Sequence, residues 1–182
     1  LAHHIVRRPC QIRIIPNGVD VSRFSPTTAR DSLRGKLGLP LDRLIIGSVG
    51  RLEPVKNYGL AIQALARLLE SGGLPLQPIL VLAGDGLERS ELEGLAGRLG
   101  LSGSIRFLAW REDAEHLYPA FDLFTLTSRS EGTSISLLES MSCGVCPVVT
   151  DVGGNRNVLG MSLADLLVPD NDAEALAARW RR

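Results

Sequence analysis

The sequence predicts an α/β domain in which helices cover both faces of a parallel sheet. Short apolar runs alternate with helical segments, the loops between them are short, and the runs are apolar throughout. Strands and helices that alternate in this way form parallel βαβ units. A strand that is apolar throughout is buried on both faces. We therefore expect a Rossmann-like, three-layer α/β/α domain of about six strands.

The first half of the chain supplies three of the expected strands, at 44–49, 79–83 and 105–108. Apolar residues recur at helical spacing after each of the first two strands, which predicts amphipathic helices. Asn57 is expected to cap the first of these helices. Asp85, in a Gly-Asp-Gly turn, is expected to be a turn residue or the cap of the second.

The second half supplies strands at 123–127, 146–149 and 165–168. A helix is expected before the first of these strands, at 114–121, and another after residue 134. Glycine favours the position just past a helix end, so Gly144 should terminate the second of these helices. Asp172 should cap a last helix, after which Arg181 and Arg182 are expected to form a solvated tail.

Composition limits the class of protein. The chain has 182 residues, enough for one well-packed domain, with 45% hydrophobic residues and 20 basic against 20 acidic side chains. A net charge of zero argues against nucleic-acid binding, which depends on neutralising phosphates. No apolar run is long enough to span a membrane. The first residues, which include Arg7 and Arg8, lack an initiator Met and an apolar signal core, so we expect a piece of a longer protein.

The pair Cys143 and Cys146 allows a redox interpretation, because Cys-x-x-Cys beside a βαβ unit can be thioredoxin-like. A redox pair, however, lies at the amino end of a helix, where the helix dipole lowers a thiol pKa. This pair is expected to straddle a helix end and the following strand, so we interpret it as structural. Two cysteines without a nearby histidine cannot complete a zinc site. This cysteine usage is typical of a reducing cytosol.

Residues 123–154 form the stretch around which the chain is organised. They read as strand, loop, helix and strand, and ligands of such sheets bind where the strands end. Glu131 lies in the loop and Glu139 in the helix. The backbone amides of Gly132, Thr133 and Ser134 can face an anion at the helix start. Carboxylates accept from hydroxyl groups and amides donate to phosphate, so the pattern suits a ligand that carries both.

A purely structural interpretation of the two glutamates stays open. Ser136 and Glu139 have the spacing of a helix capping box, and so do Ser128 and Glu131.

A second loop with binding chemistry follows the first strand, at Gly50-Arg51-Leu-Glu-Pro-Val-Lys56-Asn57. Arginine binds phosphate oxygens through two donors and lysine adds a compact charge, so Arg51 and Lys56 could hold a diphosphate. Cations in a loop are more often merely solvated, and that alternative remains. The loop lacks the glycine spacing of a Walker loop.

Taken together, these phrases resemble the retaining glycosyltransferases of family 4. The resemblance rests on Glu131-x₇-Glu139 with the Cys-Gly-x-x-Pro-Val-Val and Val-Gly-Gly phrases that follow, on Pro-Asn-Gly-Val-Asp…Phe at 16–24, and on the Gly-Arg-x₄-Lys-Asn loop. It covers roughly residues 12–178. Members of this family have the GT-B fold, two facing Rossmann-like domains. The resemblance implies that this chain is the carboxyl-terminal, donor-binding domain.

The resemblance also implies roles for the site residues. Glu139 would hold the nucleotide ribose and Glu131 would lie beside the donor sugar. Gly50, Arg51 and Lys56 would grip the diphosphate, so that the two cations offset the charge of the leaving group. The amides of Gly132, Thr133 and Ser134 would contact sugar and diphosphate. The loop with Trp110 and Arg111 would bracket the base; from the residues alone, Trp110 either covers the base or merely packs.

The sequence departs from the family pattern at two positions. Ala109 stands where the family usually has Gly, which leaves the base preference open. Asn157 stands where the family usually has Glu, so a helix start or an acceptor contact could be altered. His116 is expected to be a surface or core residue without a catalytic role.

The resemblance assigns residues 1–20 to the end of the acceptor domain and the interdomain linker. Residues 21–182 form a nucleotide-sugar-binding domain that ends early. Its partners would be a nucleotide-sugar donor and, through the missing domain, a glycan or lipid-linked acceptor in bacterial cell-surface polysaccharide synthesis. No cofactor or metal is expected. The expected location is the cytoplasm, with the full-length parent at the inner face of the membrane.

Two other functions remain open. The chain would be a nucleotide-sugar-binding module without turnover of its own if it acts without the acceptor domain. A nucleotide-sugar epimerase of related fold would need further acid and base residues beside the sugar, and none is evident.

Overall fold

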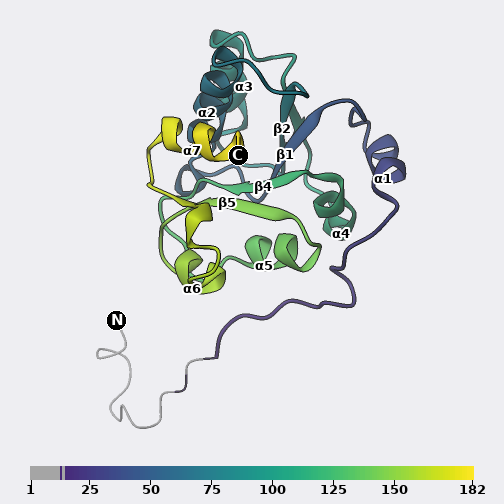
Figure 1. Cartoon of the computed structure of the whole chain (residues 1–182), viewed down its shortest axis with the longest axis vertical. Coiled ribbons are helices and arrows are strands. Elements are labelled where there is room, and N and C mark those ends of the chain that lie inside the picture. The colour runs from purple at the N-terminus through teal and green to yellow at the C-terminus, as the bar shows by residue number, and fades with distance from the viewer. Residues whose placement is uncertain (1–12, 14) are drawn as a thin grey trace.

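The computed structural model describes residue 13 and residues 15–182, which form an α/β/α domain (Figure 1). The basic pair at residues 7 and 8, Cys10 and most of the predicted linker lie outside the described residues. The predicted division of the chain at residue 20 therefore stays a prediction. Among the described helices, none is both long and apolar enough to cross a membrane.

Six parallel strands form one sheet in the order β3-β2-β1-β4-β5-β6, so the predicted parallel sheet is confirmed. The chain starts in the middle at β1, adds strands toward one edge, and then returns to pair β4 with the other side of β1. Ligands of such sheets bind at this reversal point. The strands are β1 (Leu44–Val49), β2 (Pro78–Ala83), β3 (Ile105–Leu108), β4 (Leu123–Leu126), β5 (Cys146–Thr150) and β6 (Leu167–Val168).

Helices cover both faces of the sheet because successive strand residues point to opposite sides. Ile46 packs into a core with α2 (Tyr58–Glu70), α3 (Arg89–Arg98) and α7 (Ala173–Trp180). Ile45 packs into a second core on the other face. That second core is formed with α1 (Arg30–Lys36), α4 (Ala114–Leu117), α5 (Ile135–Ser142) and α6 (Asn155–Leu159). The two groups of helices lie on opposite sides of the sheet in Figure 1.

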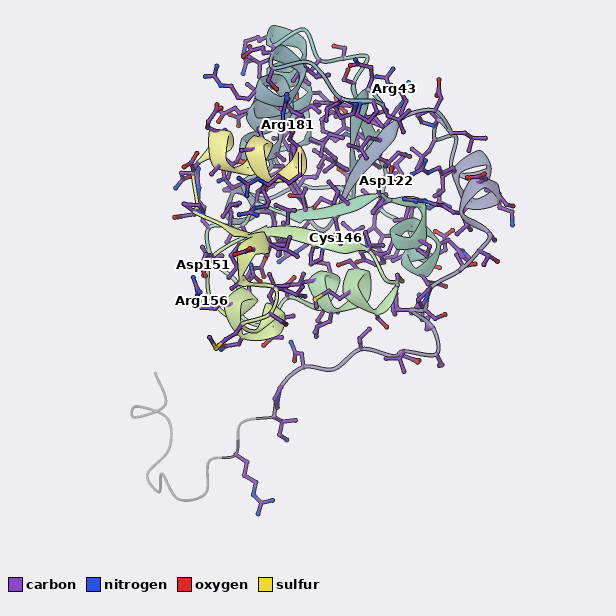
Figure 2. All side chains as sticks on the ribbon, in the orientation of Figure 1. Arg43, Asp122, Cys146, Asp151, Arg156 and Arg181 are labelled. Atoms are coloured by element: carbon purple, nitrogen blue, oxygen red, sulfur yellow. The ribbon has the colours of Figure 1, made fainter. Side chains whose placement is uncertain are left out.

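Asp122 ties α1 to the sheet. Its carboxylate accepts from the backbone N–H of Ile45 at 2.6 Å, from Arg30 at 2.6 Å and from Arg34 at 2.7 Å. Arg34 is buried and also donates to the carbonyl of Ala120 at 2.8 Å. Figure 2 labels Asp122 at the amino end of β4, on the side of the molecule where α1 lies.

Two predicted elements are wrong in extent. The helix expected at 114–121 consists of α4 followed by a 3₁₀ turn, η4 (Tyr118–Ala120). Pro119 has no N–H to continue the α-helical ladder. The strand expected at 165–168 is limited to the two residues of β6, because η5 (Ala164–Leu166), another 3₁₀ turn, precedes it.

The predicted cap at Asn57 is wrong, and Asp85 takes the first of the two roles predicted for it, that of a turn residue. Asn57 stands at the N-cap position of α2, but its backbone is left-handed, with φ 51°, and its side chain makes no capping bond. That side chain bonds to Asn171 instead, at 3.3 Å. Asp85 does not cap α3. It is a turn residue whose carboxylate accepts from the N–H of Gly86 at 2.8 Å.

Arg181 and Arg182 are exposed, as expected of a solvated tail, although Arg181 also donates to the carbonyl of Gly72 at 2.7 Å and contacts Ser71. The predicted helix end at Gly144 is confirmed, since this glycine has φ 75° and donates to the carbonyl of Met141. The cap at Asp172 is confirmed by its bond from the N–H of Ala175 at 2.8 Å.

Cys143 and Cys146 are free thiols at the end of α5 and the start of β5. Burial raises the pKa of Cys143 to about 11 and also raises the pKa of Cys146. A raised thiol pKa opposes the thiolate that redox chemistry requires, which agrees with the structural interpretation.

Candidate functional site

The loops that follow β1 and β4 meet at the reversal point of the sheet. The N–H of Arg129 donates to the carbonyl of Val55 at 2.9 Å, and the hydroxyl of Thr127 donates to the carbonyl of Lys56 at 3.0 Å. The first loop contains a short 3₁₀ turn, η3 (Pro54–Lys56). The structure therefore joins the two loops to which the sequence assigned binding chemistry.

Lys56 and Glu131 form an ion pair between these loops. The Lys56 Nζ and Glu131 Oε1 atoms are 2.7 Å apart, and the two side chains are only 20% and 10% exposed. The hydroxyl of Ser128 donates to the same Glu131 oxygen at 2.6 Å. Both predicted site residues thus lie in one place, but each binds the other. Lysine has three donors, so two remain for a ligand.

The backbone amides of the predicted anion site are open. Among the hydrogen bonds of the described residues, none uses the N–H of Gly132, Thr133 or Ser134. Ser134 is the N-cap of α5, and its side chain accepts from the N–H of Leu137. The three amides therefore stand at the start of α5 beside the Lys56–Glu131 pair. The carbonyl of Thr133 accepts from the side chain of Asn17, at 3.1 Å.

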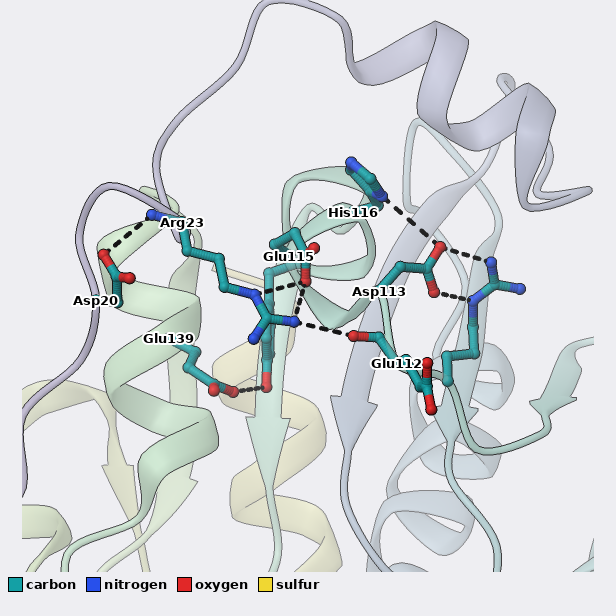
Figure 3. A network of polar contacts seen from close by, with 9 residues as sticks. Asp20, Arg23, Glu112, Asp113, Glu115, His116 and Glu139 are labelled. Carbon is teal, nitrogen blue, oxygen red and sulfur yellow. Dashed lines mark hydrogen bonds and ion pairs between the residues drawn. The ribbon is translucent and has the colours of Figure 1, made fainter.

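Glu139 lies on the next turn of α5 and is half-buried. Its Oε2 accepts from the hydroxyl of Tyr118 at 2.5 Å; Figure 3 labels Glu139 at this contact. Burial is the main cause that raises the pKa of Glu139, while the Tyr118 bond and the positive charge of Arg23 oppose the rise. The capping interpretation of Glu139 is wrong, because Ser134 and not Ser136 caps the helix.

The other capping interpretation is wrong as well. Ser128 and Glu131 lie in the loop before α5, where their side chains bond to each other.

The remaining predicted residues lie in loops at the same edge of the sheet but are more exposed. Arg51 is 73% exposed and pairs with Glu53 at 2.7 Å. Trp110 is 66% exposed, so the packing alternative is wrong for the described chain. Arg111 pairs with Asp113 through two contacts, at 2.7 and 2.8 Å, and this pairing lowers the pKa of Asp113 to about 2.

His116 is an exposed surface residue, as expected, 3.6 Å from Asp113. The departures from the family pattern have little local consequence. Ala109 is exposed, and α6 forms with an exposed Asn157 inside it.

Four glycines allow the loops to pack closely, which the sequence did not reveal. A Cβ atom at Gly153 would lie 1.7 Å from the carbonyl oxygen of Glu131, and one at Gly154 would lie 2.4 Å from that of Gly132. At Gly84 a Cβ would lie 2.0 Å from the carbonyl oxygen of Gly50. Gly86 has the same relation to residue 52, at 2.5 Å. The signal was present as glycines just after strand ends, but their partners are far away in sequence.

Arg23 and Tyr118 were also missed. Arg23 pairs with Glu115 at 2.7 Å and donates to the carbonyl of Glu112 at 2.9 Å, which holds the segment after residue 20 against α4 (Figure 3). Asp20 shapes this turn by accepting from the N–H of Arg23 at 3.2 Å. Neither Arg23 nor Tyr118 belongs to a recognisable sequence motif, because each acts through a partner in a distant segment.

No group of three or more metal-ligating side chains occurs in the part of the chain that the structure describes. A polar cavity of about 420 Å³ lies between α2 and α3, bordered by the loops that carry Asn57 and Asn171. It does not include Lys56, Glu131 or Glu139. The geometry of the predicted residues, and not this cavity, therefore defines the candidate site.

Comparison with known proteins shows which family the chain resembles. The model of the family "Glycosyl transferases group 1" matches residues 29–182. The chain is 36% identical over 177 residues to a D-inositol 3-phosphate glycosyltransferase of Corynebacterium urealyticum, a match that covers 92% of this chain and 41% of that protein. It is 31% identical to the UDP-Gal:alpha-D-GlcNAc-diphosphoundecaprenol alpha-1,3-galactosyltransferase of Escherichia coli, covering 92% of this chain and 43% of that protein.

Among solved structures, the chain is similar to Anabaena Alr3699/HepE in complex with UDP and glucose. The TM-score is 0.82 at 29% identity, over 94% of this chain and 46% of that one. The chain thus spans less than half the length of these relatives.

Proposed function

The chain belongs to the group 1 glycosyl transferases, and we propose that it is the half of such an enzyme that binds a nucleotide-sugar donor. The family predicted from the sequence is thereby confirmed. The observation that carries the proposal is the arrangement at the reversal point of the sheet. One carboxylate-bearing helix, a set of open amides and a partly buried lysine–glutamate pair lie there together.

Each part of this arrangement suits one part of the donor. A carboxylate accepts from vicinal hydroxyls, so Glu139 would bind the ribose. The open amides at Gly132–Ser134 and the free donors of Lys56 would bind the diphosphate. Glu131 has one oxygen held by Lys56 and Ser128, and its other oxygen would accept from a hydroxyl of the donor sugar.

The proposed reaction is retaining transfer of the glycosyl group. Glycosyl transfer passes through an oxocarbenium-like state while negative charge grows on the leaving diphosphate. Lys56 and Arg51 would stabilise that charge where it develops. Lys56 is already fixed by Glu131, so it needs little rearrangement. Arg51 is exposed and would have to leave Glu53 to reach the diphosphate.

We further propose that the donor is bound without a metal ion, and that the acceptor is a glycan or lipid-linked glycan of the bacterial cell surface. The Escherichia coli relative, whose name includes GlcNAc-diphosphoundecaprenol, supports the acceptor class. The acceptor would be held by an amino-terminal domain of the full-length parent, in the cytoplasm at the inner face of the membrane.

A second candidate is a binding module without turnover. It is favoured by the geometry of the site, since the residues proposed to bind ribose and diphosphate all lie within this one domain. Adding the parent's acceptor domain and an acceptor would distinguish the two, because only the enzyme half would then show transfer.

Titration of the chain with UDP, GDP and ADP by calorimetry tests the proposal. We expect one nucleotide to bind selectively and Glu139→Ala to weaken it at least tenfold, because a charged hydrogen bond to the ribose contributes about 1.5–3 kcal/mol. Glu91→Ala, which removes an exposed glutamate on α3, is the control and should bind as the unaltered chain does. A folded chain that binds none of the three nucleotides would contradict the proposal.

Arg51→Ala tests the mechanism in the full-length parent. We expect the rate of transfer to fall by about 10²-fold while nucleoside affinity changes little, since Arg51 would act on charge that develops only in the transition state. Arg67→Ala is the control, because this exposed arginine lies on α2 and pairs only with Glu70 among the described residues. An equal fall in rate and affinity would make Arg51 an ordinary binding residue.

A further inference from the structure

The hydroxyl of Tyr118 has a fixed direction. The side chain is completely buried, and its ring makes edge-to-face contacts with Phe24, Phe121 and Phe124 at centroid distances of 5.9, 6.4 and 5.8 Å. Such contacts favour one ring orientation. The hydroxyl therefore points in one direction, and it donates to Glu139.

This bond gives the two carboxylate oxygens of Glu139 different roles. Oε2 accepts from Tyr118 at 2.5 Å, whereas Oε1 has no hydrogen-bond partner among the described residues. A carboxylate fixed through one oxygen presents the other in a set orientation, and pre-set geometry strengthens binding because less motion is lost. The free oxygen is the one available to a diol.

We propose that Tyr118 is a positioning residue, whose hydroxyl fixes the Glu139 carboxylate so that Oε1 accepts from the ribose hydroxyls and ribonucleotides bind better than 2′-deoxyribonucleotides. Tyr118 does not touch the nucleotide, because it is completely buried. The inference rests on the proposed function, in which Glu139 binds the ribose.

The charges around Glu139 give the inference a pH signature. Four groups on separate elements face the carboxylate: Tyr118 on η4, Arg23 in the turn after residue 20, Glu115 on α4 and Cys143 at the end of α5. Burial raises the pKa of Glu139, and the Tyr118 bond is the largest influence that lowers it. Without this hydroxyl the pKa rises further. The ionised carboxylate is the stronger acceptor. As the pH falls, nucleotide binding by a variant that lacks the Tyr118 hydroxyl should therefore begin to weaken at a higher pH than binding by the unaltered chain.

Titrations of Tyr118→Phe with whichever of UDP, GDP and ADP the unaltered chain binds, and with the 2′-deoxy form of that nucleotide, test this inference from about pH 5 to about pH 8. We expect the unaltered chain to favour the ribonucleotide about tenfold. We expect the preference of the variant to be about fivefold smaller, because one hydrogen bond of about 1 kcal/mol changes an affinity by about that factor. We also expect its binding to weaken at a higher pH. Thr125→Val is the matched control. It removes another buried hydroxyl, which donates to the carbonyl of Val148 at 3.0 Å, and should leave preference and profile unchanged.

The outcomes separate the two proposals. A folded Tyr118→Phe chain with the native preference and the native pH profile overturns this inference and leaves the proposed function intact. Failure of the unaltered chain to bind UDP, GDP or ADP overturns the proposed function itself. If the variant does not fold, NMR of the unaltered chain decides. The Tyr118 hydroxyl proton should exchange slowly and persist when that nucleotide is bound, and its loss on nucleotide binding would contradict the positioning role.

Discussion

Asp122→Ala is expected to lower the free energy of unfolding by about 3–5 kcal/mol, because it leaves a buried charge without its partner. The charge is that of Arg34, whose side chain is 6% exposed and whose Nη2 lies 2.7 Å from the carboxylate. Arg30 adds less, since its side chain is 38% exposed and water can replace the lost contact. The variant also removes the acceptor of the Ile45 N–H.

Urea denaturation followed by circular dichroism would measure this change. Asp42→Ala is the matched control: Asp42 is exposed just before β1 and its side chain makes no hydrogen bond among the described residues, so the expected change is within about 0.5 kcal/mol. Asp122→Asn should lie between the two, because an amide can still accept from Arg34 but carries no charge. A loss below about 1 kcal/mol for Asp122→Ala would mean that Arg34 reaches solvent when its partner is gone.

The fold was predictable because it depends on local patterns. Continuous apolar runs marked the six strands, and helical spacing marked the helices between them. Errors arose where a local preference was overridden. Asn57 has a favourable cap residue type, yet its left-handed backbone turns its side chain toward Asn171. Residues 118–121 continue an apolar helical pattern, but a proline ends the ladder.

The residues of the candidate site could be predicted from the sequence, but the contacts between them could not. The positions of Lys56 and Glu131 after neighbouring strands placed both residues at one edge of the sheet. Their direct pairing depends on how two loops fold, which no residue pattern encodes. Tyr118 is the clearer case: only the packing of η4 beside α5 brings its hydroxyl to Glu139. In sequence it was simply an apolar residue of an expected helix.

Close contact between loops explains why the site also depends on residues without functional groups. Gly153 presses against the carbonyl of Glu131, and Gly154 donates its N–H to the carbonyl of Gly132 at 2.9 Å. The loop after β5 thereby supports the loop that carries the open amides. Its glycines determine where the Glu131 backbone lies, and through it the Lys56–Glu131 pair.

Gly153→Ala is accordingly expected to weaken binding of the nucleotide that the chain selects by about tenfold or more, since each hydrogen bond that a displaced amide loses to a charged phosphate contributes about 1.5–3 kcal/mol. The new Cβ would lie 1.7 Å from the Glu131 carbonyl oxygen, so the two loops must separate. Overpacking of this kind costs about 1–3 kcal/mol of stability. A further cost of about 1 kcal/mol comes from placing alanine at φ 53°.

Gly100→Ala provides the control for this substitution. Gly100 also has a positive φ, 69°, in the turn that ends α3, but a Cβ there meets nothing within 4 Å. It should therefore cost only the backbone term of about 1 kcal/mol and leave nucleotide affinity unchanged. Calorimetry of both variants, with their stability measured in urea, isolates the steric contact from the backbone conformation. Equal affinities in the two variants would show that the loop after β5 does not position the Glu131 backbone, and that the amides at the start of α5 hold their place without it.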